Sequence, residues 1–126
     1  MTAALDGVRV LVVEDEFLIA MLLQEMLESA GCVVSGPIPR LAEALDAAAG
    51  GTYDAAVLDV NLAGERVDPV AQALARRDIP FVFVTGYGAN TLPADYAHRP
   101  SLRKPFKMAD LLDMLSSVVA PPSVSA

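Results

Sequence analysis

The stretch VRVLVVEDEF (Val8–Phe17) joins two kinds of sequence that rarely stand side by side. Its first part, Val8–Val13, is an apolar run rich in β-branched residues, which is typical of a buried strand. Three carboxylates, Glu14, Asp15 and Glu16, follow directly. Adjacent carboxylates raise one another's pKa values unless a positive charge lies among them. The end of this strand is therefore expected to meet a cation or a basic side chain.

Similar apolar runs recur along the chain, at Cys32–Ser35, Asp54–Leu58, Phe81–Val84 and Ser101–Arg103. Between them, apolar residues repeat at the three- and four-residue spacing of a helix. Strands that alternate with helices predict βαβ units with right-handed crossovers. We therefore expect an α/β fold with a doubly wound, five-stranded parallel sheet and helices on both faces.

Glycine and proline mark the expected helix ends. Gly31 and the pair Gly50-Gly51 end two helices, and Asp68-Pro69 is interpreted as an N-cap followed by proline at the first helical position. The fourth helical segment, Ala89–Arg99, contains Pro93 and has little periodicity, so its helix is expected to be short or irregular. The last helix is expected at Met108–Val119.

The chain has 126 residues, which suggests a single domain that can bury an adequate core. We assign residues 7–119 to it, residues 1–6 to an N-terminal extension and residues 120–126 to a disordered tail. Cys32 is the only cysteine, which excludes an internal disulfide and favours a reducing compartment. Its residue type fits a small buried hydrophobe better than a reactive thiol.

Charge and hydropathy exclude several classes of partner. The net charge of −7 argues against nucleic-acid binding, which needs a positive surface. No secretory signal is visible at the N-terminus, and the longest apolar run, Phe17–Leu23, is too short to cross a membrane, which needs about 20 residues. A cytoplasmic location without membrane contact is expected.

The residues at the ends of the strands carry the functional prediction. In an open parallel sheet, ligands bind beyond the carboxyl ends of the strands. There the sequence places, in addition to the acids after the first strand, Asp59, Thr85 and Lys104. Clustered carboxylates with room for water suit Mg²⁺. With that cation bound, Asp59 can act as a nucleophile toward a phosphoryl group, while Lys104 and Thr85 contact the phosphoryl oxygens.

Taken singly, each of these residues has an ordinary structural explanation. Asp59 alone would be a turn residue, Thr85 a strand residue and Lys104 a solvated lysine. Glu16 is assigned to the N-terminal dipole of the first helix rather than to the metal, and His98 to a solvent-facing loop. Four functional residue types at four strand ends favour the joint interpretation.

These motifs resemble the receiver domain of bacterial two-component response regulators over about residues 7–119. VLVVEDE is similar to the acidic-pair motif, which places the pair at Glu14 and Asp15. VLDVN is similar to the phosphoacceptor motif, with Asp59 as acceptor and the Asn61 carbonyl as a further Mg²⁺ ligand. The resemblance also implies the flavodoxin-like strand order 2-1-3-4-5. It makes Thr85 a switch residue and the Lys104–Pro105 peptide bond cis.

A narrower resemblance lies in PFVFVTGYG (Pro80–Gly88), which is similar to the signature of FATGUY single-domain receivers. The sequence departs from the general receiver pattern at three residues. Ser101 stands where most receivers have an aromatic switch residue, and Leu62-Ala63 replaces the usual Met-Pro. We therefore expect Tyr87 and the loop Gly86–Arg99 to carry the rearrangement.

The resemblance implies a phosphorylation switch. A sensor histidine kinase or a histidine phosphotransfer protein would supply the phosphoryl group, and a downstream protein would recognise the changed surface. A phosphate sink or relay is an alternative. A small Mg²⁺-dependent aspartyl phosphatase is less favoured, because Asn61 stands where such enzymes have a second Asp. We expect no catalysis beyond the domain's own phosphorylation and dephosphorylation. The complete site argues against an inert binding module, and the absence of a glycine-rich loop after the first strand argues against a nucleotide site.

Overall fold

A five-stranded parallel sheet forms the centre of the molecule. The computed structural model describes residues 5–86, 92, 94–96 and 98–119. In that part the strands of the sheet are β1 (Arg9–Val13), β2 (Val33–Ile38), β3 (Ala55–Asp59), β6 (Phe81–Thr85) and β7 (Ser101–Arg103). They pair in the order β2-β1-β3-β6-β7, and every neighbouring pair is parallel. This is the flavodoxin-like order 2-1-3-4-5, so the predicted fold class is confirmed.

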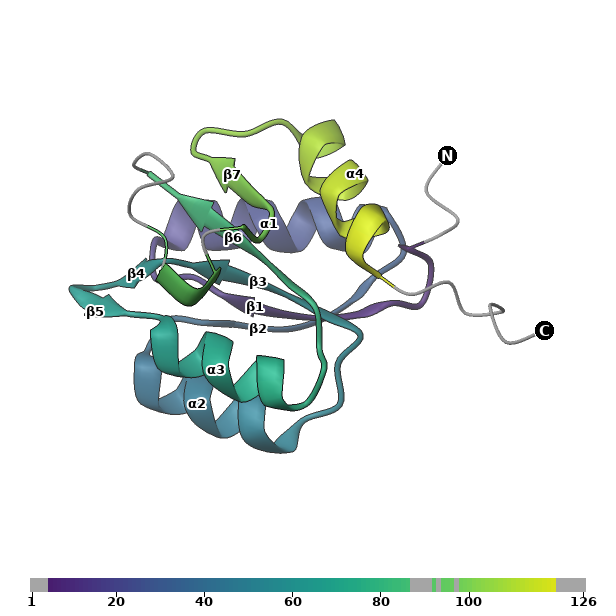
Figure 1. Ribbon diagram of the computed structural model, residues 1–126. Coiled ribbons are helices and arrows are strands. Elements are labelled where there is room, and N and C mark those ends of the chain that lie inside the picture. Colours follow the sequence, from purple (N-terminus) through teal and green to yellow (C-terminus); the bar gives the residue numbers. More distant parts are fainter. Residues whose placement is uncertain (1–4, 87–91, 93, 97, 120–126) are drawn as a thin grey trace.

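Helices cover both faces of the sheet (Figure 1). On one face lie α1 (Phe17–Ser29) and α4 (Met108–Val118); on the other lie α2 (Leu41–Gly50) and α3 (Asp68–Arg76). Among the described residues, no helix is long and apolar enough to span a membrane.

The strands divide their side chains between two cores because successive residues point to opposite faces. In β1, Leu11 and Val13 pack in the core beneath α2 and α3, whereas Val10 and Val12 pack in the core beneath α1 and α4. Strands β3 and β6 are buried at every position. A continuous apolar strand therefore reflects a sheet covered on both sides, as the sequence indicated.

The start of the described chain is tied to the end of α1. Leu5, which we assigned to the N-terminal extension, is fully buried. The Gly7 N–H donates to the Gly31 carbonyl at 2.8 Å. Gly31 has a φ of +93°, and a Cβ there would collide with Asp6. Glycine is thus required where the chain leaves α1.

At the edge of the sheet opposite the acidic residues, Arg9 and Asp54 join β1 to β3. The backbone N–H and the Nε of Arg9 donate to Asp54 Oδ2 at 2.9 and 3.3 Å. These hydrogen bonds lower the pKa of the Asp54 carboxyl. Side chains therefore join the two strands that carry the acidic residues at the end away from those residues.

The fourth helical segment is a single 3₁₀ turn in its described part, η3 (Ala94–Tyr96). The Tyr96 ring meets Phe81 edge to face with centroids 5.5 Å apart, and the Arg99 guanidinium lies 4.4 Å from the centre of the Phe81 ring. These contacts attach η3 to β6. Residues 87–91, 93 and 97 of the loop lie outside the described residues.

Two local features differ from the sequence prediction. A short antiparallel hairpin, β4 (Asn61–Leu62) and β5 (Glu65–Arg66), follows β3 and was not predicted. Helix α3 includes Asp68, with Val67 as its N-cap, so the predicted cap was wrong by one residue. The Asp68 carboxylate accepts from Arg66 Nε at 3.0 Å and makes no cap hydrogen bond.

Candidate functional site

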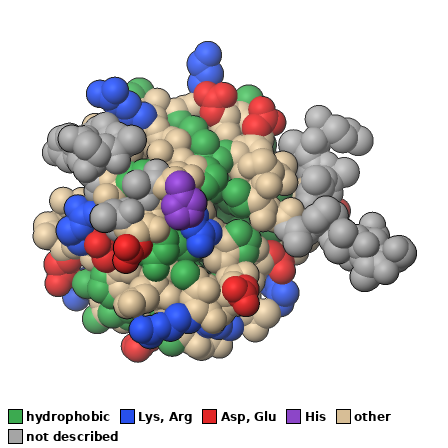
Figure 2. All heavy atoms as spheres, in the orientation of Figure 1, with side chains coloured by type: hydrophobic (Ala, Val, Ile, Leu, Met, Phe, Trp, Pro, Cys, Tyr) green, Lys and Arg blue, Asp and Glu red, His purple; other side chains and the backbone are tan. Residues whose placement is uncertain are grey.

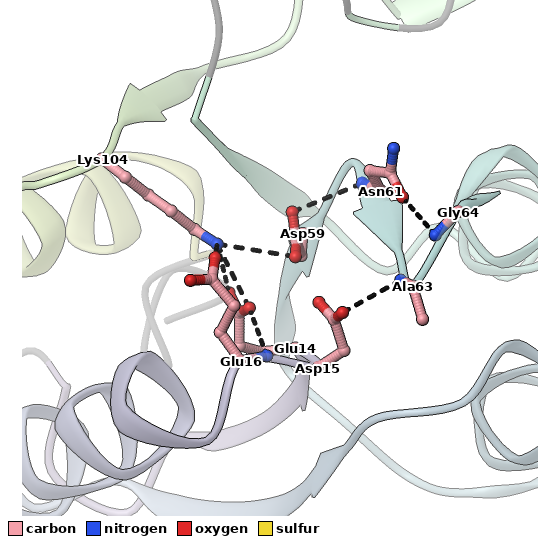
Figure 3. Close-up of polar contacts among 8 residues, drawn as sticks. All are labelled: Glu14, Asp15, Glu16, Asp59, Asn61, Ala63, Gly64 and Lys104. Atoms are coloured by element: carbon pink, nitrogen blue, oxygen red, sulfur yellow. Dashed lines mark hydrogen bonds and ion pairs between the residues drawn. The ribbon is translucent and has the colours of Figure 1, made fainter.

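The acidic residues of two neighbouring strands meet at one edge of the sheet. Strand β1 pairs with β3 from Val10 opposite Ala55 to Val13 opposite Leu58, so the residues that follow lie side by side. Glu14, Asp15 and Asp59 each offer a carboxylate oxygen, and these oxygens lie within 4.8 Å of one another. Figure 3 shows the three carboxylates converging, with Lys104 reaching them from the far side.

The hairpin after β3 holds Asp15 and Asp59 through backbone N–H groups. Asp15 Oδ2 accepts from the Ala63 N–H at 2.9 Å, and Asp59 Oδ1 accepts from the Asn61 N–H at 3.3 Å. The Asn61 side-chain oxygen accepts from the Gly64 N–H at 2.8 Å, which closes the turn (Figure 3). The hairpin therefore shapes one wall of the site.

Lys104 reaches the cluster from the end of β7. Its backbone N–H donates to the Thr85 carbonyl at 2.7 Å, and the following Lys104–Pro105 peptide bond is cis. The Nζ lies 3.1 Å from each carboxylate oxygen of Glu14 and 3.5 Å from Asp59 Oδ2. Burial by itself would lower the pKa of Lys104, but the carboxylates of Glu16, Asp59 and Glu14 together raise it. The Lys104 side chain therefore stays positively charged in the site.

Glu14 and Asp59 are buried carboxylates in need of further positive charge. Glu14 Oε2 accepts hydrogen bonds from the Glu16 N–H at 3.0 Å and from Lys104 Nζ at 3.1 Å. Glu14 Oε1 is buried and makes no hydrogen bond, although it lies in an ion pair with Lys104 Nζ at 3.1 Å. Burial, and then the negative charge of Glu14, raises the pKa of Asp59 to about 8. One ammonium does not neutralise three carboxylates.

A hard divalent cation such as Mg²⁺ fits these residues. It prefers oxygen ligands, and it usually keeps several bound waters. Such an ion would offset the mutual repulsion of the three acids and would bind the buried Glu14 Oε1, which accepts no hydrogen bond. The adjoining cleft is open, with a volume of about 620 Å³, and leaves room for water and a substrate group.

Thr85 lies where the sequence placed it, at the end of β6. It is buried and lines the same cleft, together with Gly86, Asn61 and Arg66. His98 is exposed, as expected, and Tyr87 lies outside the described residues. The cleft therefore brings together the strand-end residues predicted from sequence.

Glu16 lies at the start of α1, as assigned, and has a side-chain partner that was not predicted. It occupies the N-cap position of α1 but makes no cap hydrogen bond. Its Oε1 instead contacts Lys104 Nζ at 2.7 Å. The residue pattern could not show this, because Glu16 precedes a helix and the direction of its side chain depends on the distant Lys104.

The family comparison agrees with this geometry. Residues 10–116 match the family model described as the response regulator receiver domain. The chain belongs to this family.

The receiver domain is similar to both single-domain and longer proteins. It is 36% identical over 118 residues to the transcriptional regulatory protein TcrA of Mycobacterium tuberculosis. The aligned region covers 90% of this chain and 46% of TcrA. The chain thus spans about half the length of the curated relatives it matches. SdrG from Sphingomonas melonis Fr1 is 44% identical, with a TM-score of 0.80 over 89% of this chain and 96% of SdrG.

A second similar structure contains a metal. The receiver domain of the sensor histidine kinase PA1611 from Pseudomonas aeruginosa PAO1 has a magnesium ion coordinated in its active-site cleft. It is 26% identical to this receiver domain, with a TM-score of 0.74 over 89% of this chain and 97% of that one.

Proposed function

We propose that Asp59 accepts a phosphoryl group from a phosphohistidine, with Mg²⁺ bound beside it, and that the new charge switches a protein–protein interaction. The observation that supports this most directly is the position of the Asp59 carboxylate. It lies within 4.8 Å of the Glu14 and Asp15 oxygens and 3.5 Å from Lys104 Nζ. A nucleophile is thus surrounded by the groups that phosphoryl transfer requires.

In this proposal Glu14, Asp15 and Asp59, with the Asn61 carbonyl, hold Mg²⁺, which neutralises charge on the transferred group when bound. An Asp59 oxygen attacks phosphorus, so a P–O bond forms while the P–N bond to the donor imidazole breaks. The electron pair of that bond leaves with the imidazole, which takes up a proton. Lys104 Nζ then pairs with the phosphoryl oxygens, and the Thr85 hydroxyl donates a hydrogen bond to them.

The surface around the cleft supports a protein as the phosphodonor. Phe17 and Leu18, directly after the acids, are 72% and 77% exposed. Met21 and Leu22 continue this apolar surface along α1. Large exposed apolar side chains beside a reactive centre favour contact with another protein. A sensor histidine kinase or a histidine phosphotransfer protein, docked on this surface, would place its phosphohistidine at Asp59.

The proposed output surface consists of η3, β7 and α4. Figure 2 shows this face, with hydrophobic side chains gathered over β7 and α4. Lys104 and Thr85 connect this face to the site, because the Lys104 N–H bonds the Thr85 carbonyl. Movement of either side chain toward a phosphoryl group would be transmitted to β7. The expected downstream partner is a protein in the cytoplasm, because the net charge of −7 disfavours nucleic acid.

We propose further that the domain is not an enzyme toward other substrates. Asn61 stands two residues after Asp59, and its amide cannot act as a general acid. Its side-chain oxygen is also engaged by the Gly64 N–H. The only catalysis expected is phosphorylation and dephosphorylation of Asp59 itself.

The test is intact-mass spectrometry after incubation with Mg²⁺ and acetyl phosphate. The wild type should gain the mass of one phosphoryl group, and the gain should be absent in Asp59→Asn and after chelation of Mg²⁺. Asp54→Asn is a matched control, because Asp54 lies at the opposite end of β3 and should not affect labelling. An adduct of equal yield in Asp59→Asn would overturn the assignment.

A further inference from the structure

Lys104 makes its shortest contact with an acid that the proposed metal site does not use. Its Nζ lies 2.7 Å from Glu16 Oε1, 3.1 Å from Glu14 and 3.5 Å from Asp59. The contacts with Glu16 and Glu14 are hydrogen bonds, whereas the contact with Asp59 is an ion pair only. Lys104 is therefore directed mainly at residues other than the proposed phosphoacceptor.

Glu14 and Glu16 differ in how readily they can release the lysine. The Glu14 side chain is fully buried at 0% exposure, and separation would leave its charge unpaired in the interior. The Glu16 side chain is 61% exposed and would be solvated by water as soon as it moved away. Glu16 is thus the partner that Lys104 can exchange.

A phosphoryl group on Asp59 would compete with Glu16 for this lysine. It adds up to about two negative charges and three acceptor oxygens. Lys104 must then turn from Glu16 toward Asp59, and Glu16 also lines the cleft that the phosphoryl group enters. Its carboxylate opposes the phosphorylated state in two ways, by holding the lysine and by repelling the new anion.

We propose that Glu16 is a positioning residue that holds Lys104 in the unphosphorylated site and so weakens the binding of a phosphoryl group. This proposal rests on the proposed function, because it needs a phosphoryl group at Asp59. Removal of the Glu16 charge then strengthens anion binding. The expected gain is roughly two- to fivefold, since an exposed ion pair contributes little.

The probe is BeF₃⁻, a phosphoryl mimic, titrated into the full chain at saturating Mg²⁺ and followed by ¹H–¹⁵N NMR. Because the loss of a nearby negative charge can weaken metal binding, the Mg²⁺ affinity of each variant is measured first. Glu16→Gln should reach half-saturation at a BeF₃⁻ concentration roughly two- to fivefold lower than that of the wild type. Equal concentrations for the two proteins would overturn the proposal.

Two further variants separate the lysine contact from the effect of charge. Glu25→Gln makes the same charge change at an exposed position of α1 and should behave as the wild type. Glu16→Asp keeps the charge but is shorter and suits the N-cap, so it should release Lys104 while still repelling the anion. Its half-saturation should therefore fall between those of the wild type and Glu16→Gln. A shift of equal size in Glu25→Gln, or wild-type behaviour of Glu16→Asp, would contradict the role of the contact.

The wild type tests the underlying function in the same experiment. If BeF₃⁻ with Mg²⁺ fails to perturb the wild-type site, the phosphoacceptor proposal itself fails and the Glu16 proposal with it. If the wild type binds and the Glu16 variants do not differ from it, only the Glu16 proposal fails.

Discussion

Glu14 and Glu16 are chemically identical and two positions apart, yet their side chains differ in burial. Glu14 continues the buried strand direction of β1 and is enclosed, while Glu16 stands at the start of α1 and remains exposed. Lys104 contacts both. Lys104 can leave the exposed Glu16 and still remain paired with the buried Glu14. This arrangement suits a site whose charge would change when Asp59 is phosphorylated.

Asp59 gives a prediction about stability without metal. Its pKa is raised to about 8, first by burial and then by Glu14. For an acid whose folded-state pKa lies above its unfolded value, the stabilising contribution is full below the unfolded pKa and is lost as pH rises toward the folded pKa. Metal-free wild type should therefore lose stability between about pH 4 and pH 8, and Asp59→Asn should lose less.

The measurement is the melting temperature in chelator between pH 4.5 and pH 8. At pH 7.5 the Asp59→Asn variant should be more stable by on the order of 1–2 kcal/mol, and the difference should shrink at pH 4.5. Asp54→Asn, at the other end of β3, should be no more stable than the wild type, because Arg9 lowers the pKa of that carboxyl. A pH-independent difference between Asp59→Asn and the wild type would contradict the argument.

The sequence predicted which side chains would meet because strand ends are easy to recognise in buried apolar runs. Glu14, Asp15, Asp59 and Lys104 each follow such a run, and the parallel sheet places their positions at one edge. Glu16 escaped prediction because its partner is 88 residues away in the chain. Local sequence indicates a helix start there but gives no side-chain direction.

Among the secondary-structure elements too, some could be predicted from the sequence pattern and others could not. Strands β1, β3 and β6 and the α-helices of the described part of the chain have enough residues for a periodic pattern. Each strand of the hairpin β4–β5 has two residues, which is too few to show alternation. Its shape comes from backbone geometry, with positive φ at Ala63 and Gly64 and two carboxamide or carboxylate contacts from Asn61 and Asp15. The Asp15 contact, to a residue 48 positions away, exists only after β1 and β3 have paired.

Helix α1 leads to a prediction about donor recognition. Phe17 is 72% exposed beside the acidic site, so its ring contributes little to the fold and is available to a docked protein. Phe17→Ala should slow phosphoryl transfer from a phosphorylated histidine phosphotransfer protein roughly fivefold or more, as aromatic residues often dominate interfaces. Labelling by acetyl phosphate should be unchanged. Both rates are measured by intact mass over time.

The control for Phe17 is Val33→Ala. Val33 is 55% exposed and apolar but begins β2, at the opposite end of the sheet from the site. The Val33→Ala variant should be phosphorylated at the wild-type rate by either donor. If Phe17→Ala slowed both donors equally, the residue would be acting on the site rather than on docking.

At the scale of the whole molecule, the site joins parts of the chain that are distant in sequence. Lys104 and Glu14 are 90 residues apart, and Asp59, at the end of β3, lies between them in the sequence. A cation shared by β1 and β3 would bind only the folded chain, because the unfolded chain does not bring its ligands together. Its binding free energy therefore adds to the stability of the entire domain.

Mg²⁺ should consequently raise the melting temperature of the wild type. At a concentration 100 times its Kd, the ion should stabilise the fold by about 2.7 kcal/mol, or by roughly 10 °C. Asp15→Asn removes one carboxylate from the cluster and should abolish most of this rise in melting temperature. Asp46→Asn, at an exposed position of α2, should show the same rise as the wild type. Scans in NaCl of equal ionic strength separate binding from screening. The same Mg²⁺-induced shift in Asp15→Asn as in the wild type would mean that the ion binds elsewhere, and the acidic edge of the sheet would then lose its proposed function.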